Sequence, residues 1–356
     1  MMIQSRWNSR TQKLLVVTAS AAIAFASLLH PQRANAAASD YRILNQAIEV
    51  NGVRSSLSAL NTDNTTYIAI RSLNNSIGLT TDWDQAKQVV TVSGRDRELA
   101  LNLKDGSATL NGQQIYGLPA IVQNNTTYVP FRFLLERMGF GVAYDSSTKV
   151  IGIEAIKEND LQIATEVIRE KSTDKSLAIH YPQLSGLVSK EAEKKINETL
   201  KSDAELNAEV ARDSLEQALG DGDFKPTMPV SFEGTYTITY NEQGKLSLYV
   251  DYYIYTGGAH GSTARVPYTF DLSSGKVVTL KEAALGKENY VAIINAKIQS
   301  QIKARGIKML NPFKTIEPDR DYFLKHNGVV VYFGQYEYTP YAEGMPEFEI
   351  PFSDFK

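Results

Sequence analysis

The pattern of apolar and polar positions predicts strands in both halves of the chain and helices mainly in the second. The segments SFEGTYTITY (231–240) and KLSLYVDYYIYT (245–256) are rich in β-branched and aromatic residues, which are typical of strands. Residues 190–219 and 287–305 instead have apolar residues three and four apart, which predicts helices. This mixture predicts an α+β fold in which helices pack on one side of an antiparallel sheet.

The first half contains an internal repeat with an offset of 61 residues. NTTYIAIR at 64–71 recurs as NTTYVPFR at 125–132. In each copy a glycine, Gly78 or Gly139, follows seven residues after the arginine. Each copy is predicted to form a strand, a helix that begins near the arginine, and a closing strand. The expectation is a two-copy strand-helix-strand domain over residues 40–155.

This repeat resembles the small N-terminal domain that is named after bacterial copper amine oxidases, over 48–153. The resemblance implies a stalk domain without oxidase chemistry, which belongs to a larger domain with a self-processed tyrosine and a copper site. Arg71 and Arg132 recur at equivalent positions, and we expect them to cap carbonyls or to pair with carboxylates such as Asp84 and Asp145.

The most distinctive stretch of the second half is TGGAHG, which lies between two predicted strands. Three glycines in so short a run predict a turn with few side chains, either a tight hairpin or a presented loop. Tyrosines flank it on both sides. The candidate ligand-binding residues are Tyr253, Tyr255, Thr256, Gly257, Gly258, Ala259, His260 and Gly261.

This loop, the following FDLSSGKVVTL (270–280) and the tail VVVYFGQYEYTPYAEGMPEFEIPF (329–352) resemble the C-terminal domain of the lysozyme-sensing anti-sigma factors. The same domain occurs beside the catalytic domain of some secreted peptidoglycan deacetylases. The resemblance implies a strand-helix companion region at 157–255, a sensor-like region at 256–356, and recognition of a lysozyme-like protein or of peptidoglycan. It does not imply transmembrane signalling, because a stalk domain stands where those sensors have a membrane helix and a sigma-binding segment.

The N-terminus has the pattern of a secretory signal peptide, residues 1–36. Basic residues precede the apolar run LLVVTASAAIAFASLL, and Ala34-Asn35-Ala36 follows as a small-x-small cleavage site. An uncleaved anchor is the alternative, but the run has 16 residues, short of the usual ~20 for a membrane span. The chain has no cysteine, which excludes lipid attachment at a cleavage-site cysteine. We expect a secreted or extracellular Gram-positive protein, with association with the cell wall as one form of this expectation.

The charge of the chain gives a weak indication about its partners. The formal charge is −3, and without residues 1–36 the balance becomes 33 basic against 40 acidic residues. An acidic protein has no general attraction to nucleic acid, so no nucleic-acid partner is expected. A cationic protein would be attracted to it.

No motif in the sequence predicts catalysis or a metal site. The histidines after the signal peptide, His180, His260 and His326, are too far apart to predict a ligand cluster, so no metal or cofactor is expected. The leading hypothesis is therefore a non-enzymatic binding protein. One alternative is a structural wall-associated or matrix protein without a specific ligand. Another is a cell-wall glycan hydrolase with His260 as a base, which would need acids beside it.

Overall fold

The computed structural model describes residues 41–62, 65–73, 77–115, 120–220, 226 and 228–356, so the expected signal peptide lies outside the described residues. These residues form two compact units, one that ends at Glu158 and one that runs from Asn159 to Lys356. Within the described ranges, no helix has both the length and the apolar character needed to cross a membrane.

The first unit is built from two sheets. One has seven strands in the order β11-β12-β1-β2-β3-β10-β9, and the other has five antiparallel strands in the order β4-β5-β6-β7-β8. Their shared core includes Ile48, Leu99 and Leu134, all inaccessible to solvent. The elements are β1 (Leu44–Val50), β2 (Val53–Thr62), β3 (Thr65–Ala69), β4 (Thr80–Asp84), β5 (Val89–Gly94), β6 (Arg97–Asn102), β7 (Ala108–Leu110), β8 (Gln113–Ile115), β9 (Ile121–Gln123), β10 (Thr126–Pro130), α3 (Phe131–Arg137), β11 (Phe140–Asp145) and β12 (Val150–Ala155).

The two copies of the sequence repeat follow different paths, so the two-copy strand-helix-strand domain is not confirmed. Strands β3 and β10 are equivalent in sequence and pair with each other antiparallel. After β10 the chain forms helix α3, whereas after β3 it forms the 3₁₀ turn η2 (Ile70–Ser72), and 74–76 lie outside the described residues. The closing strands also differ, because β11 and β12 join the seven-stranded sheet while β4 and β5 join the other.

Arg132, Asp84 and Asp145, three of the charged residues that recur in the repeat, make contacts close to their own positions in the sequence. Arg132 donates to the carbonyl of Val142 at 2.9 Å and pairs with Glu136 at 3.0 Å. Asp84 and Asp145 instead accept hydrogen bonds from backbone N–H groups of their own turns. Hydrogen bonds from the side chains of Ser147 and Thr148, together with those from the backbone of the turn, lower the pKa of Asp145.

The charged segment 154–160, EAIKEND, has the composition of a linker but makes contacts within each unit. In the first unit Arg97 forms a two-pronged ion pair with Glu158, with a shortest distance of 2.6 Å. In the second unit Asn159 donates from its backbone to the carbonyl of Asn241 at 3.0 Å and from its side chain to the carbonyl of Lys245 at 2.9 Å.

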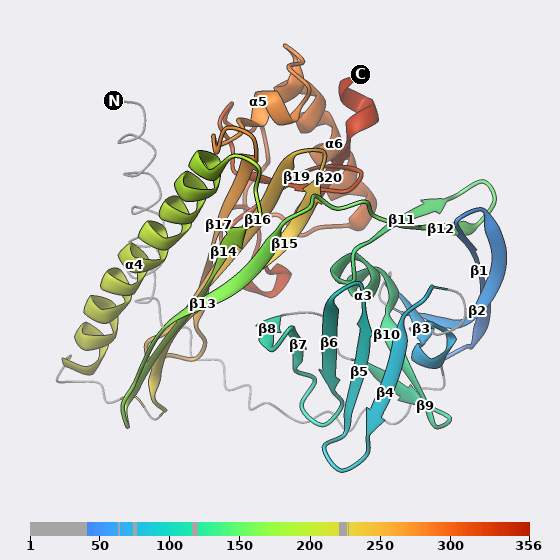
Figure 1. Ribbon diagram of the computed structural model, residues 1–356, viewed down its shortest axis with the longest axis horizontal. Helices are drawn as coiled ribbons and strands as arrows, with labels where there is room; N and C mark the ends of the chain where they lie inside the picture. The colour runs from blue at the N-terminus through green and yellow to red at the C-terminus, as the bar shows by residue number, and fades with distance from the viewer. Residues whose placement is uncertain (1–40, 63–64, 74–76, 116–119, 221–225, 227) are drawn as a thin grey trace. The chain divides into compact units, whose positions relative to one another are not determined.

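The second unit contains a five-stranded sheet whose strands follow one another in sequence order. Helix α4 (Lys190–Gly220) runs along one face of it (Figure 1). The hydroxyl of Ser189, a residue type that favours the N-cap, accepts a hydrogen bond from the N–H of Ala192 at 3.2 Å. The strands are β13 (Gln162–Lys171), β14 (Lys175–Ser185), β15 (Val230–Glu242), β16 (Lys245–Tyr255) and β17 (Ser262–Asp271).

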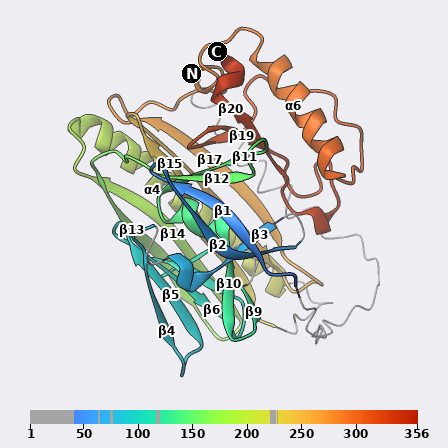
Figure 2. The same cartoon turned by 90° about the vertical axis from the view of Figure 1, so that its right-hand side faces the viewer.

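A smaller antiparallel sheet of three strands covers part of the other face. Val330 and Tyr332 pack toward Tyr249 of the large sheet, and the alternate residues Val329 and Val331 pack toward α6. Figure 2 shows α6 beside β20. The elements are α5 (Leu280–Ala283), α6 (Tyr290–Arg305), β18 (Tyr322–Lys325), β19 (Gly328–Tyr332), η3 (Tyr341–Glu343), β20 (Glu347–Pro351) and η4 (Phe352–Phe355).

Three expectations for the second unit need correction. The two long helices lie on opposite outer sides with two sheets between them, rather than on one side of one sheet. The large sheet is not purely antiparallel, because α4 carries the chain across it and makes β14 and β15 parallel. The alternating Tyr336 and Tyr338 would be expected to place one ring on each face of a strand, but both lie in the connection between β19 and β20.

The expected boundary between the regions 157–255 and 256–356 falls inside the hairpin of β16 and β17. These strands pair from Lys245↔Asp271 to Ile254↔Ser262. Both regions belong to the same compact unit.

A buried ionic network joins the two sheets of this unit. Arg265 of β17 binds both carboxylate oxygens of Asp251 on β16, at 2.7 and 2.8 Å, and Glu347 of β20 at 2.7 Å. Its guanidinium lies 3.7 Å from the ring centre of Tyr249. Burial on its own would lower the pKa of Arg265, but Asp251, Tyr249 and Glu347 together raise it well above its ordinary value.

Glu347 should make stability depend on pH at the join between the sheets. Burial would raise the pKa of Glu347, but Lys325 and Arg265 together lower it below its ordinary value. A carboxylate with a lowered pKa stabilises the folded state above its unfolded-state pKa, and this contribution is lost as pH falls through the folded-state pKa. We expect Glu347→Gln to cost about 1–3 kcal/mol at pH 7 and much less at an acidic pH below the lowered folded-state pKa, well under about pH 4.

The measurement is urea unfolding at the two pH values, followed by amide hydrogen exchange in β20. Glu349→Gln is the matched control, because it makes the same change two residues along the same strand. A cost of Glu347→Gln that is equal at both pH values would contradict the assignment.

Candidate functional site

The candidate loop is the six-residue connection 256–261 between β16 and β17. Gly258, Ala259 and His260 are exposed, whereas Gly257 and Gly261 are buried. Gly257 has φ +99°, a backbone conformation that residues other than glycine rarely adopt. The loop is therefore a hairpin connection whose tip presents mainly backbone to solvent.

Gly261 is a glycine because the ring of Tyr253 lies directly on its backbone. A Cβ atom at this position would stand 2.3 Å from the Tyr253 ring. At Gly258 the nearest heavy atom to such a Cβ is the carbonyl oxygen of His260 at 3.9 Å. Close packing therefore requires glycine at 261, while space is open at 258.

A segment far along the chain completes the site. The ring of Tyr341, in the β19–β20 connection, stacks on His260 with a centroid distance of 4.0 Å, and its hydroxyl donates to the carbonyl of Gly261 at 3.1 Å. Tyr336 lies 5.7 Å from Tyr341 and is half exposed. We call Tyr253, His260, Tyr336 and Tyr341 the aromatic cluster.

The same two segments are also joined at the first residues of β17. The N–H of Thr263 donates to the side-chain oxygen of Gln335 at 2.8 Å. Sequence reasoning named the tyrosines of the tail as aromatics but did not assign Gln335, Tyr336 or Tyr341 to the site. The signal that could have found them was the shared resemblance of the loop and the tail to one family.

Two tyrosines of the aromatic cluster contribute neutral hydroxyl groups. Burial raises the pKa of Tyr253, with a smaller contribution from Tyr341, and burial also raises the pKa of Tyr341. Both hydroxyls therefore remain donors at neutral pH. Nδ1 of His260 lies 2.9 Å from the carbonyl of Gly261, which only accepts, so this nitrogen carries the hydrogen.

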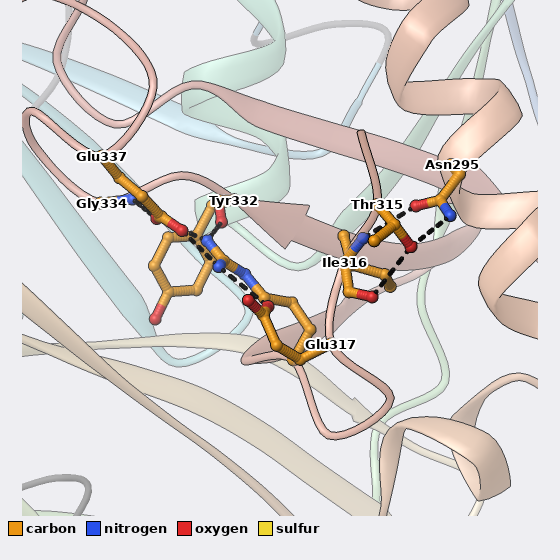
Figure 3. A network of polar contacts seen from close by, with 8 residues as sticks. Asn295, Thr315, Ile316, Glu317, Tyr332, Gly334 and Glu337 are labelled. Atoms are coloured by element: carbon orange, nitrogen blue, oxygen red, sulfur yellow. Dashed lines mark hydrogen bonds and ion pairs between the residues drawn. The ribbon is translucent and has the colours of Figure 1, made fainter. Parts of the chain in front are cut away.

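A second ionic network holds the start of the β19–β20 connection (Figure 3). Arg320 donates to the carbonyl of Tyr332 at 2.7 Å and to the carboxylate of Glu337 at 2.6 Å, which also accepts from the N–H of Gly334 at 2.8 Å. Burial would lower the pKa of Arg320, but Glu337, together with Glu317 and Asp321, raises it above its ordinary value. Nearby, Asn295 of α6 binds Thr315 and Ile316.

The remaining candidates do not gather into a catalytic arrangement. Tyr255 is 9% exposed, and Thr256 is partly buried. His180 approaches the carbonyl of Gly234 at 3.3 Å, and His326 pairs with Glu242 at 2.9 Å. Within the described ranges, no group of three His, Cys, Asp or Glu side chains could hold a metal ion.

Family models match three successive parts of the chain. The copper amine oxidase N-terminal domain matches residues 48–153, Deacetylase PdaC matches 168–263, and Protein of unknown function (DUF3298) matches 283–353. The expected resemblances are confirmed: a copper amine oxidase N-terminal domain precedes PdaC-like and DUF3298 domains.

The chain is similar to anti-sigma-V factor RsiV of Bacillus subtilis (strain 168), with 28% identity over 211 residues. The alignment covers 52% of this chain and 65% of RsiV, and it agrees with the expected domain architecture.

Two solved structures of DUF3298 family members are also similar. That from Bacteroides fragilis NCTC 9343 has 15% identity and a TM-score of 0.42, covering 55% of this chain and 92% of its own. That from Pseudomonas aeruginosa PAO1 has 17% identity and a TM-score of 0.37, covering 55% and 93%. Both TM-scores are too low to support an argument.

The packing of Tyr253 on Gly261 can be tested by adding a single methyl group. Gly261→Ala should destabilise the second unit by about 1–3 kcal/mol and loosen the loop, because overpacking forces a ring or the backbone to move. Gly258→Ala, which adds the same methyl group to the exposed tip, should change stability by less than about 0.5 kcal/mol. Urea unfolding and amide exchange of 253–263 measure both effects.

Combining Gly261→Ala with Tyr253→Ala removes the clash and should restore part of the loop's protection. Equal effects of the two glycine variants would contradict this account of the loop.

Proposed function

We propose that this chain is a secreted, non-enzymatic binding protein of a Gram-positive cell envelope, which recognises a lysozyme-like protein or peptidoglycan. In this proposal a signal peptide (1–36) and a stalk domain (40–155) precede a binding region (157–356). The contact surface is the loop 256–261 with the aromatic cluster. The observation that carries the proposal is the convergence of two distant segments, in which Tyr341 stacks on His260 and binds the carbonyl of Gly261, 80 residues away in the sequence.

The similarity to an anti-sigma factor supports a role in sensing or binding. The lysozyme-sensing anti-sigma factors, which the loop and tail resemble, provide the candidate partner. The acidic balance of the chain is consistent with a cationic protein partner, because opposite charge raises the rate of encounter.

The surface chemistry of the loop suits binding. Tyr336 and His260 expose amphipathic rings, which are enriched at the centre of protein interfaces. Beside them Gly258 and Ala259 present an exposed backbone that a partner can approach closely. Tyr255 is buried and contributes to the site by packing.

The test is calorimetry of the mature chain with chicken-type lysozyme and, separately, with soluble peptidoglycan fragments. We expect saturable binding to one of them, weakened at least about tenfold by Tyr336→Ala and by His260→Ala, because an exposed ring can be removed without unfolding the protein. Tyr144→Ala is the matched control, since Tyr144 is 53% exposed but lies in the first unit. It should leave binding unchanged.

No saturable binding to either probe would favour the structural alternative, in which the two units only pack and assemble. The name of the PdaC family supports a second candidate, a hydrolase that acts on wall glycan. Release of acetate or of cleaved glycan during the titration, lost in His260→Ala, would contradict the non-enzymatic proposal.

A further inference from the structure

Strand β13 forms an edge of the large sheet of the second unit. It pairs with β14 along its full length, from Gln162↔Ser185 to Lys171↔Ser176, without a register shift. No other described strand pairs with it, and Figure 1 shows it at the margin of the sheet. Proteins usually shorten such edges, interrupt them with proline or a bulge, or place charged side chains on them. This edge has ten residues, no proline and no bulge, and its four charges are of both signs: Glu166 and Glu170, Arg169 and Lys171.

The backbone groups that face outward follow from the hairpin turn. The N–H of Ser172 donates to the carbonyl of Lys175 at 2.8 Å, so these two residues form a hydrogen-bonded pair. Antiparallel pairs alternate between hydrogen-bonded and non-bonded. Thr165 and Pro182 then form a non-bonded pair, which suits a proline because it has no N–H. The residues whose N–H and C=O face outward are Ile163, Thr165, Val167, Arg169 and Lys171.

The same alternation explains why β14 does not end at Pro182, although proline often ends a strand. The strand continues to Ser185 because Pro182 occupies a position that owes no hydrogen bond to β13.

We propose that β13 pairs antiparallel with β13 of a second copy of this chain, forming a two-fold dimer with one continuous sheet. The dimer axis passes through Val167, which is 41% exposed and would lie opposite its own counterpart. The other outward pairs place Thr165 opposite Arg169 and Ile163 opposite Lys171. Roughly ten backbone hydrogen bonds would form across the axis.

Charge selects this register over its neighbours. Backbone hydrogen bonds form across the axis only where residues whose N–H and C=O face outward lie opposite one another. The register can therefore shift only in steps that keep these residues paired. In the proposed register Glu166 lies opposite Ile168, and Glu170 lies opposite Ala164. One step either way places Glu166 opposite Glu166 or opposite Glu170 of the second copy, and like charges in direct opposition destabilise a pair of strands. The partner that fits this edge is therefore the same strand.

Sedimentation equilibrium of the full chain tests for the dimer. Val167→Lys places two ammonium groups opposite each other on the axis, beside Arg169, and should raise the dimer dissociation constant at least about tenfold. Val188→Lys is the control, because Val188 is fully exposed and lies outside β13. It should leave the dissociation constant unchanged. A monomer at every concentration, or a dimer that Val167→Lys does not weaken, would overturn the proposal.

A single cysteine tests the register, because the chain has none of its own. In a hydrogen-bonded pair the Cα atoms lie about 5.5 Å apart, which is within the range of a disulfide. Val167→Cys should therefore give a covalent dimer on mild oxidation. Arg169→Cys should not, because its counterpart would be about 13 Å away along the strand. Preferential cross-linking of Arg169→Cys, or of neither variant, would overturn the register.

Discussion

The second unit depends most on the buried guanidinium of Arg265. This group is bound on one side by Asp251 and on the other by Glu347, and its side chain is 8% exposed. Removing one carboxylate would leave a buried charge with an incomplete set of partners, which is far more costly than losing an exposed ion pair. The network therefore fixes the hairpin of β16 and β17 against β20.

The position of the candidate site follows from this constraint. The loop 256–261 closes the hairpin that contains Asp251 and Arg265, and the connection that contains Tyr336 and Tyr341 leads into β20. Arg320 secures the beginning of the same connection through Glu337. The aromatic cluster is thus formed by two loops whose supporting strands are joined by charge-assisted hydrogen bonds. Its exposed members need little rearrangement before they meet a partner.

Local signals in the sequence predicted the elements but not their arrangement. The start of α4 at Ser189 and the stop of α6 at Gly306 follow from capping chemistry, which depends only on neighbouring residues. The parallel pairing of β14 with β15 and the stacking of Tyr341 on His260 depend on residues distant in the sequence. The residue-by-residue pattern does not encode these pairings, and only the joint resemblance of loop and tail indicated that the two segments belong together. In the first half, the closing strands of the two repeat copies have different neighbours. Strand β12 pairs in parallel with β1, whereas β5 pairs antiparallel with β6.

The most direct test of the proposed function is amide hydrogen exchange of the full chain with and without saturating chicken-type lysozyme. The measurement reports protection segment by segment and needs no substitution. The account predicts new protection in two separate segments at once, the loop 256–261 and the connection 335–343, because the aromatic cluster brings them together. Protection confined to the first unit, or to only one of these two segments, would contradict it.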